Sequence, residues 1–201
     1  MKLIFCLVGF LGYLLHPLYM KEFKSKDCVS VSPGGVTGFW EVLPKIKKIA
    51  KDSEILCASS GCIASVAKDL DFHYVFNLAT FIKNTGEPLE NMKNTFIKTI
   101  VSRIKTIPKL TIVTMDEMGK CYHTKPVNKT HLMELLVETS DIPYFTTHKN
   151  KGKLDGAVCF FYTDKCKTKI RRKFNINSFL NSLNFNLTEL EAFNLYNYNI
   201  H

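Results

Sequence analysis

Ser59 is the residue in this chain whose type and position first suggest chemistry. The apolar run at 54–58 is typical of a buried strand, and the residues after Gly61 follow a helical pattern. A serine between small residues at such a junction can form a nucleophile elbow, a tight turn that holds the hydroxyl above the sheet. The same serine could instead simply cap the helix. The neighbouring segments must decide between these two interpretations.

A glycine-rich loop lies upstream, between a second predicted strand and a second predicted helix. Residues 28–32 alternate like a strand, and the loop at 33–38 leads into a helix with one apolar side. Its glycines, Gly34, Gly35 and Gly38, allow backbone N–H groups to approach an anion closely. The N-terminus of the following helix adds a favourable potential. This unit therefore predicts a place where a negative charge could be held.

Three further segments follow downstream. Residues 109–116 predict another buried strand, and Ser-Asp-Ile-Pro-Tyr-Phe occupies 140–145. Asp155 then stands on a predicted turn beside two small residues, in Leu-Asp-Gly-Ala. Between the elbow and the third strand, 72–82 and 89–104 predict two helices, whose apolar sides could form core or flank a site.

In this order, the motifs resemble the patatin-like phospholipase family over about residues 28–157. The resemblance implies a three-layer α/β/α fold with a mainly parallel central sheet. It also implies a Ser–Asp dyad that hydrolyses acyl esters of lipids, with Ser59 as the nucleophile and Asp155 as its partner. The glycine loop would then form the oxyanion hole, through Gly34, Gly35 and Gly38.

The implied chemistry requires neither a cofactor nor a metal ion. A serine hydroxyl becomes a good nucleophile when a positioned base takes its proton, and Asp155 would do so without a histidine. Backbone N–H groups would stabilise the oxyanion, and an acyl-enzyme on Ser59 would be released by water.

Three departures from the family pattern support an alternative. Pro33 stands at the usual first glycine of the loop and removes an N–H donor. Thr37 stands where the family commonly carries Arg or Lys, and Cys57 replaces the first glycine of the elbow. The alternative is a catalytically silent protein of the same fold that binds lipid or another protein.

Length and composition predict one principal domain. The chain has 201 residues, 46% of them hydrophobic, and its strand-like and helix-like segments alternate as in α/β proteins. We expect a patatin-like catalytic domain at 27–174 and a C-terminal helical extension at 175–201. The hydrophobic N-terminal segment at 1–20 could be an uncleaved signal-anchor, a membrane-dipping helix or a buried part of the domain. Membrane association is the favoured interpretation.

The net charge of +9 suggests an anionic partner. Basic residues at 165–173 would attract phospholipid headgroups or the phosphates of nucleic acid. Nucleic acid is disfavoured because this run has no interleaved aromatic residues. The predicted partners are therefore a phospholipid or another acyl-ester lipid and a membrane surface. A second basic group lies on the first predicted helix: Lys45, Lys47, Lys48 and Lys51.

The cysteines suggest a location. An odd number of cysteines without metal-site spacing, several of them inside apolar strands, predicts buried reduced thiols. We therefore expect a membrane-associated, cytosol-facing protein. The seven cysteines are at positions 6, 28, 57, 62, 121, 159 and 166.

Overall fold

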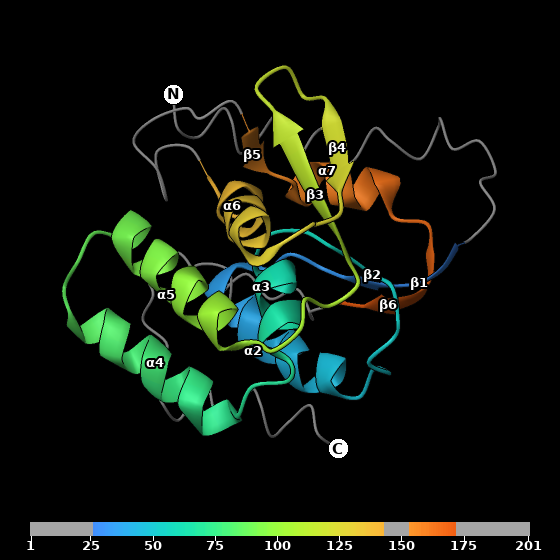
Figure 1. Ribbon diagram of the computed structural model, residues 1–201. Coiled ribbons are helices and arrows are strands. Elements are labelled where there is room, and N and C mark those ends of the chain that lie inside the picture. The colour runs from blue at the N-terminus through green and yellow to red at the C-terminus, as the bar shows by residue number, and fades with distance from the viewer. Residues whose placement is uncertain (1–25, 143–152, 172–201) are drawn as a thin grey trace.

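A computed structural model of the protein describes residues 26–142 and 153–171 (Figure 1). The predicted N-terminal segment at 1–20 and the C-terminal extension at 175–201 lie outside these residues. The described elements, in chain order, are β1 (Lys26–Val31), α2 (Gly35–Lys47), β2 (Ile55–Cys57), α3 (Ser60–Ala67), α4 (Phe72–Asn84), α5 (Leu89–Arg103), β3 (Leu110–Asp116), β4 (Cys121–Thr124), α6 (Lys129–Thr139), β5 (Lys153–Asp155), α7 (Ala157–Thr163) and β6 (Cys166–Ile170).

The strands form one mixed, mostly parallel sheet. Its order is β4-β3-β2-β1-β6, and β5 pairs with β3 outside this path. β6, β1, β2 and β3 are parallel, whereas β4 and β5 run antiparallel to β3. Val31 pairs with Cys57, and Cys57 with Ile112, so β1 and β2 end side by side, whereas β3 continues past them to Asp116. The predicted α/β class with a mainly parallel sheet is confirmed.

Helices cover both faces of this sheet. Helices α2 to α6 pack on one face around a large apolar cluster that includes Trp40, Leu43 and Leu135. A smaller cluster, with Leu56 and Phe160, fills the space between the other face and α7. Neighbouring residues of β2 contribute to opposite clusters, as the pleat of a strand requires. This arrangement is compatible with the expected three-layer architecture.

Several elements were not predicted from the sequence. β4, α6, α7 and β6 are among them, and β6 occupies much of the basic run at 165–173. The predicted helices at 72–82 and 89–104 are confirmed as α4 and α5. Within the described residues, no helix combines the length and the apolar character that a membrane span needs.

The prediction of reduced thiols is wrong for six of the seven cysteines. Disulfides join Cys28 to Cys166, Cys57 to Cys62, and Cys121 to Cys159. The spacing of cysteines along a chain does not fix which of them approach in space, so the pairing was not visible in the sequence. Disulfides persist in oxidising compartments, which removes the ground for a cytosol-facing location.

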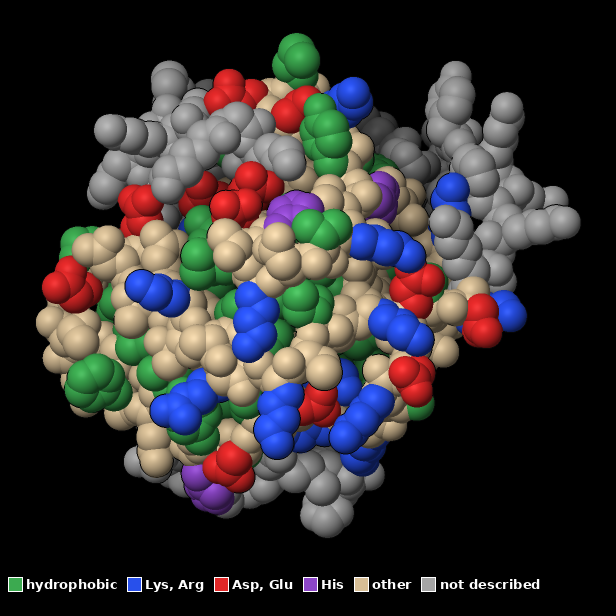
Figure 2. Space-filling model, viewed as in Figure 1, with side chains coloured by type: hydrophobic (Ala, Val, Ile, Leu, Met, Phe, Trp, Pro, Cys, Tyr) green, Lys and Arg blue, Asp and Glu red, His purple; other side chains and the backbone are tan. Residues whose placement is uncertain are grey.

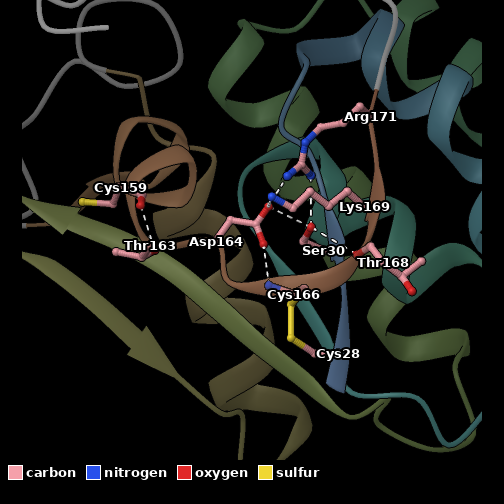
Figure 3. A network of polar contacts seen from close by, with 9 residues as sticks. All are labelled: Cys28, Ser30, Cys159, Thr163, Asp164, Cys166, Thr168, Lys169 and Arg171. Atoms are coloured by element: carbon pink, nitrogen blue, oxygen red, sulfur yellow. Dashed lines mark hydrogen bonds and ion pairs between the residues drawn. A yellow bond between two sulfur atoms is a disulfide. The ribbon is translucent and has the colours of Figure 1, made fainter. Parts of the chain in front are cut away.

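A polar network fastens β6 to the rest of the sheet (Figure 3). The Asp164 carboxylate accepts hydrogen bonds from the Ser30 hydroxyl at 2.9 Å and from the Cys166 backbone N–H at 3.0 Å. Arg171 pairs with the same carboxylate and also donates to the Ser30 hydroxyl oxygen at 3.1 Å. Because the Asp164 side chain is only 2% exposed, this ion pair compensates a buried charge.

Candidate active site

Ser59 lies in a strained turn between β2 and α3. Its backbone has φ 53° and ψ −137°, and it is the sole non-glycine residue with positive φ in the described part of the chain. Such a conformation costs on the order of 1–3 kcal/mol and persists where the surroundings enforce it, often at functional sites. The Ser59 side chain makes no helix-capping hydrogen bond. Ser59 thus occupies the N-cap position of α3 without capping the helix through its side chain, and its backbone geometry is that of an elbow.

Close backbone packing explains the glycine that follows the elbow. A Cβ atom on Gly61 would lie 2.6 Å from the Ser32 carbonyl oxygen and 2.8 Å from that of Val31. The first turn of α3 thus lies directly against the end of β1, where the glycine-rich loop begins. The disulfide between Cys57 and Cys62 joins the two sides of the elbow, with their Cα atoms 4.9 Å apart.

Thr139 supports the elbow from the end of α6. The backbone N–H of Ser59 donates to the Thr139 hydroxyl oxygen at 3.0 Å. That hydroxyl donates in turn to the carbonyl oxygen of Val113 on β3, at 2.6 Å. Thr139 is fully buried, so it forms a short polar link between the elbow and the sheet. The sequence analysis missed this residue, which directly precedes the Ser-Asp-Ile-Pro motif.

Asp155 reaches the elbow through the short strand β5. It pairs with Thr114 on β3, two residues beyond Ile112, which pairs with Cys57 on β2. This register places Asp155 at the level of Ser59 along the sheet.

Gly156 makes this approach possible. A Cβ atom at this position would lie only 2.0 Å from the Val113 carbonyl oxygen, so a side chain there would clash with the backbone of β3. The close contact with β3 therefore explains why the residue after Asp155 is a glycine.

The structure brings the two predicted dyad residues together. The Ser59 hydroxyl lies close enough to the Asp155 carboxylate to lower the pKa of that carboxyl as a hydrogen-bond donor does. The same carboxylate accepts the backbone N–H of Ala157 at 2.7 Å, which fixes its orientation. The proton of the serine hydroxyl is thus aimed at a base, as nucleophilic catalysis requires.

Burial raises the pKa of the Asp155 carboxyl from 3.8 to about 6. The hydrogen bonds from Ser59 and Ala157 and the charge of Lys93 oppose this rise, whereas the charge of Asp141 adds to it. The residue as a whole keeps partial exposure, but its carboxyl group is desolvated. A carboxylate with such a pKa is ionised at neutral pH and is a better proton acceptor than an ordinary aspartate.

The glycine-rich loop contributes fewer candidate donors than the sequence suggested. Gly34 precedes α2, and Gly35 begins it with φ 63° in the left-handed region. The N–H groups of a first helical turn have no acceptor within their own helix, so Gly35 stays a candidate oxyanion donor. Gly38 does not, because its N–H donates to the Gly34 carbonyl oxygen at 3.0 Å inside α2. The assignment of Gly38 is thereby corrected.

Two buried hydroxyls beside the dyad have no hydrogen-bond partner within the described residues. They belong to Ser60, next to the nucleophile candidate, and Thr114, opposite Asp155 in the sheet. Buried polar groups without partners are uncommon in native proteins. In the same described regions, no cluster of three or more His, Cys, Asp or Glu side chains could hold a metal ion.

No family model, curated protein or solved structure matches this chain. A functional argument therefore depends on the elbow, the dyad and the sheet that positions them. Together these features describe an α/β protein with a serine–aspartate pair at the carboxyl edge of a mainly parallel sheet.

Proposed function

We propose that this protein is a serine hydrolase of lipid acyl esters with a patatin-like fold. The observation that carries the proposal is the placement of the Asp155 carboxylate beside Ser59, which is held in its strained elbow. Strain, a positioned base and an adjacent helix N-terminus are the three parts that an acyl transfer needs.

The reaction proceeds in two acyl-transfer steps. Asp155 takes the hydroxyl proton as the Ser59 oxygen attacks the ester carbonyl carbon, and the oxyanion is stabilised by backbone N–H groups at the start of α2. The tetrahedral intermediate collapses, and the departing alcohol takes the proton from Asp155. Water then attacks the acyl-enzyme, giving one proton to Asp155. Release of the carboxylic acid returns that proton to the Ser59 oxygen.

Exposed apolar residues close in sequence to Asp141 and Asp155 support a substrate with an acyl chain. Ile142 is 41% exposed just after Asp141, and Val158 is 44% exposed at the start of α7, three residues after Asp155. Exposed apolar side chains next to a polar site are suited to a molecule with a hydrocarbon tail.

Surface charge supports a membrane as the place where that substrate is met. Figure 2 shows lysine and arginine side chains gathered over the lower half of one face, with a few acidic side chains among them. With a net charge of +9, such a surface attracts anionic headgroups at about 1 kcal/mol per charge near a membrane.

A fluorophosphonate probe tests the proposal, because it labels a serine only when a base activates that serine. We expect labelling at Ser59 in the wild-type protein and none in Ser59→Ala. Both Ser59→Ala and Asp155→Asn should lower kcat/KM for a short-chain ester by about 10³-fold or more. Far-ultraviolet circular dichroism checks that each variant is folded.

Ser60→Ala is the matched control, since it removes the adjacent buried hydroxyl and should keep the labelling. A wild-type protein that is folded but neither labelled nor active would refute the hydrolase. If that protein still bound anionic vesicles, the alternative of a catalytically silent, lipid-binding protein would replace it.

A further inference from the structure

A buried ion pair that the sequence analysis did not predict lies behind the dyad. The Lys93 ammonium donates to the Asp141 carboxylate at 2.9 Å. Their side chains are only 8% and 3% exposed. Lys93 comes from α5, and Asp141 from the segment directly after α6. Lysine and aspartate are seldom buried to this extent unless they are paired.

This pair is connected to both members of the dyad. The segment that carries Asp141 also carries Thr139, which holds the backbone N–H of Ser59. The Asp141 carbonyl oxygen accepts the backbone N–H of Asp155 at 2.9 Å. Lys93 additionally donates to the Ser140 carbonyl oxygen at 3.5 Å. A single side chain from α5 therefore fixes the three-residue segment that contacts the nucleophile and its base.

The pair also supplies charges that act on the Asp155 carboxyl. The Lys93 cation favours the ionised form of that carboxyl, and the Asp141 carboxylate disfavours it. On the two helices packed around the pair, the nearest other ionisable side chains in sequence are Glu90 and Glu138, each three residues before a member of the pair. The two members of the pair therefore shift the pKa of the Asp155 carboxyl in opposite directions.

We propose that Lys93 and Asp141 are positioning residues that hold the dyad segment in place and balance the charge beside its base. This inference rests on the proposed hydrolase function and assigns the two residues no contact with the substrate. A purely structural role explains the pair less well, because a well-packed apolar pair at a buried position is often at least as stable.

The pH dependence of kcat/KM distinguishes the two roles. The wild-type profile should rise with pH through about 6, because Asp155 must be ionised to accept the proton. In Lys93→Met the favourable cation is lost, so the midpoint of this rise should move up by about half a pH unit or more. In Asp141→Asn the repelling carboxylate is lost while the cation remains, so the midpoint should move down by a similar amount.

Opposite shifts are the decisive result. Loss of packing alone would lower the activity of both variants without moving their midpoints apart. Lys93→Arg keeps the charge, so its midpoint should remain near that of the wild type even if its kcat falls. Lys68→Met is the matched control, since Lys68 is buried even more deeply than Lys93 but pairs with Asp69 instead. Midpoints of Lys93→Met and Asp141→Asn that move together, or that do not move, overturn the proposal.

A second measurement keeps this inference separate from the hydrolase proposal. Titration of the Asp155 carboxyl by carbon-13 NMR needs no activity and should show the same opposite displacements. If the wild-type Ser59 is not labelled but the pKa of Asp155 shifts in opposite directions in the two variants, the role of Lys93 and Asp141 is supported and the hydrolase proposal is refuted. If Ser59 is labelled and the pKa of Asp155 does not shift in the variants, the hydrolase proposal is supported and the proposed role of Lys93 and Asp141 is refuted.

Discussion

At the scale of single residues, the Asp155 carboxyl links the proposed chemistry to folding stability. Its pKa of about 6 lies above the ordinary value of 3.8, so the folded protein binds this proton more tightly than the unfolded chain does. This group therefore stabilises the fold least when it is ionised. A rise of about two pKa units corresponds to on the order of 3 kcal/mol. The ionised Asp155 carboxylate, which the proposed reaction needs, thus lowers the free energy of unfolding.

The variant Asp155→Asn should consequently be more stable than the wild type above pH 6. The gain should vanish below about pH 4, where the aspartate is protonated in both the folded and the unfolded states. Urea unfolding of both proteins at several pH values measures this difference. A stability difference that stays constant from pH 4 to pH 8 would show that the carboxyl is not desolvated in the folded protein.

At the scale of secondary-structure elements, the site depends on backbones that approach one another without side chains between them. Gly61 brings α3 against the end of β1, and Gly156 brings the start of α7 against β3. These two contacts set the positions of the elbow and of Asp155 within the same sheet. Small residues at these positions are therefore explained by packing, independently of any catalytic role.

Gly156→Ala should accordingly destabilise the fold by about 3 kcal/mol or more, because the new methyl group would require the β3 backbone to move. Gly86→Ala provides the comparison. Gly86 has φ +68° but open space around it, so its substitution should cost only about 1 kcal/mol of backbone strain. Thermal unfolding of both variants measures which substitution lowers stability more. Equal losses of stability would show that β5 and α7 can move to make room for the methyl group.

The sequence predicted those parts of the site that depend on local pattern. The turn around Ser59 follows from a short apolar strand, small residues and a helical pattern within about ten residues. Lys93 and Asp141, in contrast, are 48 residues apart and meet because α5 packs against α6. The strand at Cys166–Ile170 was not predicted, because the lysines that alternate along it indicated only a charged surface.

At the scale of the whole molecule, the three disulfides of the described residues close loops of very different length. Cys28–Cys166 joins β1 to β6 across 138 residues, whereas Cys121–Cys159 spans 38 and Cys57–Cys62 only 5. In the chain-entropy description, a crosslink stabilises the fold more when it closes a longer loop of the unfolded chain. The disulfides should therefore contribute unequally to stability.

Replacing each pair by two alanines should lower the free energy of unfolding by about 5, 4 and 2 kcal/mol for Cys28–Cys166, Cys121–Cys159 and Cys57–Cys62, respectively. Guanidinium unfolding of the three double variants measures this order. A largest loss for the Cys57–Cys62 variant would contradict the loop-length argument. It would indicate instead that this disulfide is needed to hold the elbow.

Strand β6 has a consequence for how the protein meets other copies of itself. In the described sheet it has a neighbour on one side only, and Lys167 and Lys169 are exposed along it. A strand from a second molecule that aligned there would bring identical rows of positive charge together and desolvate them. The lysines on this edge strand therefore disfavour the edge-to-edge pairing of sheets that leads to aggregation.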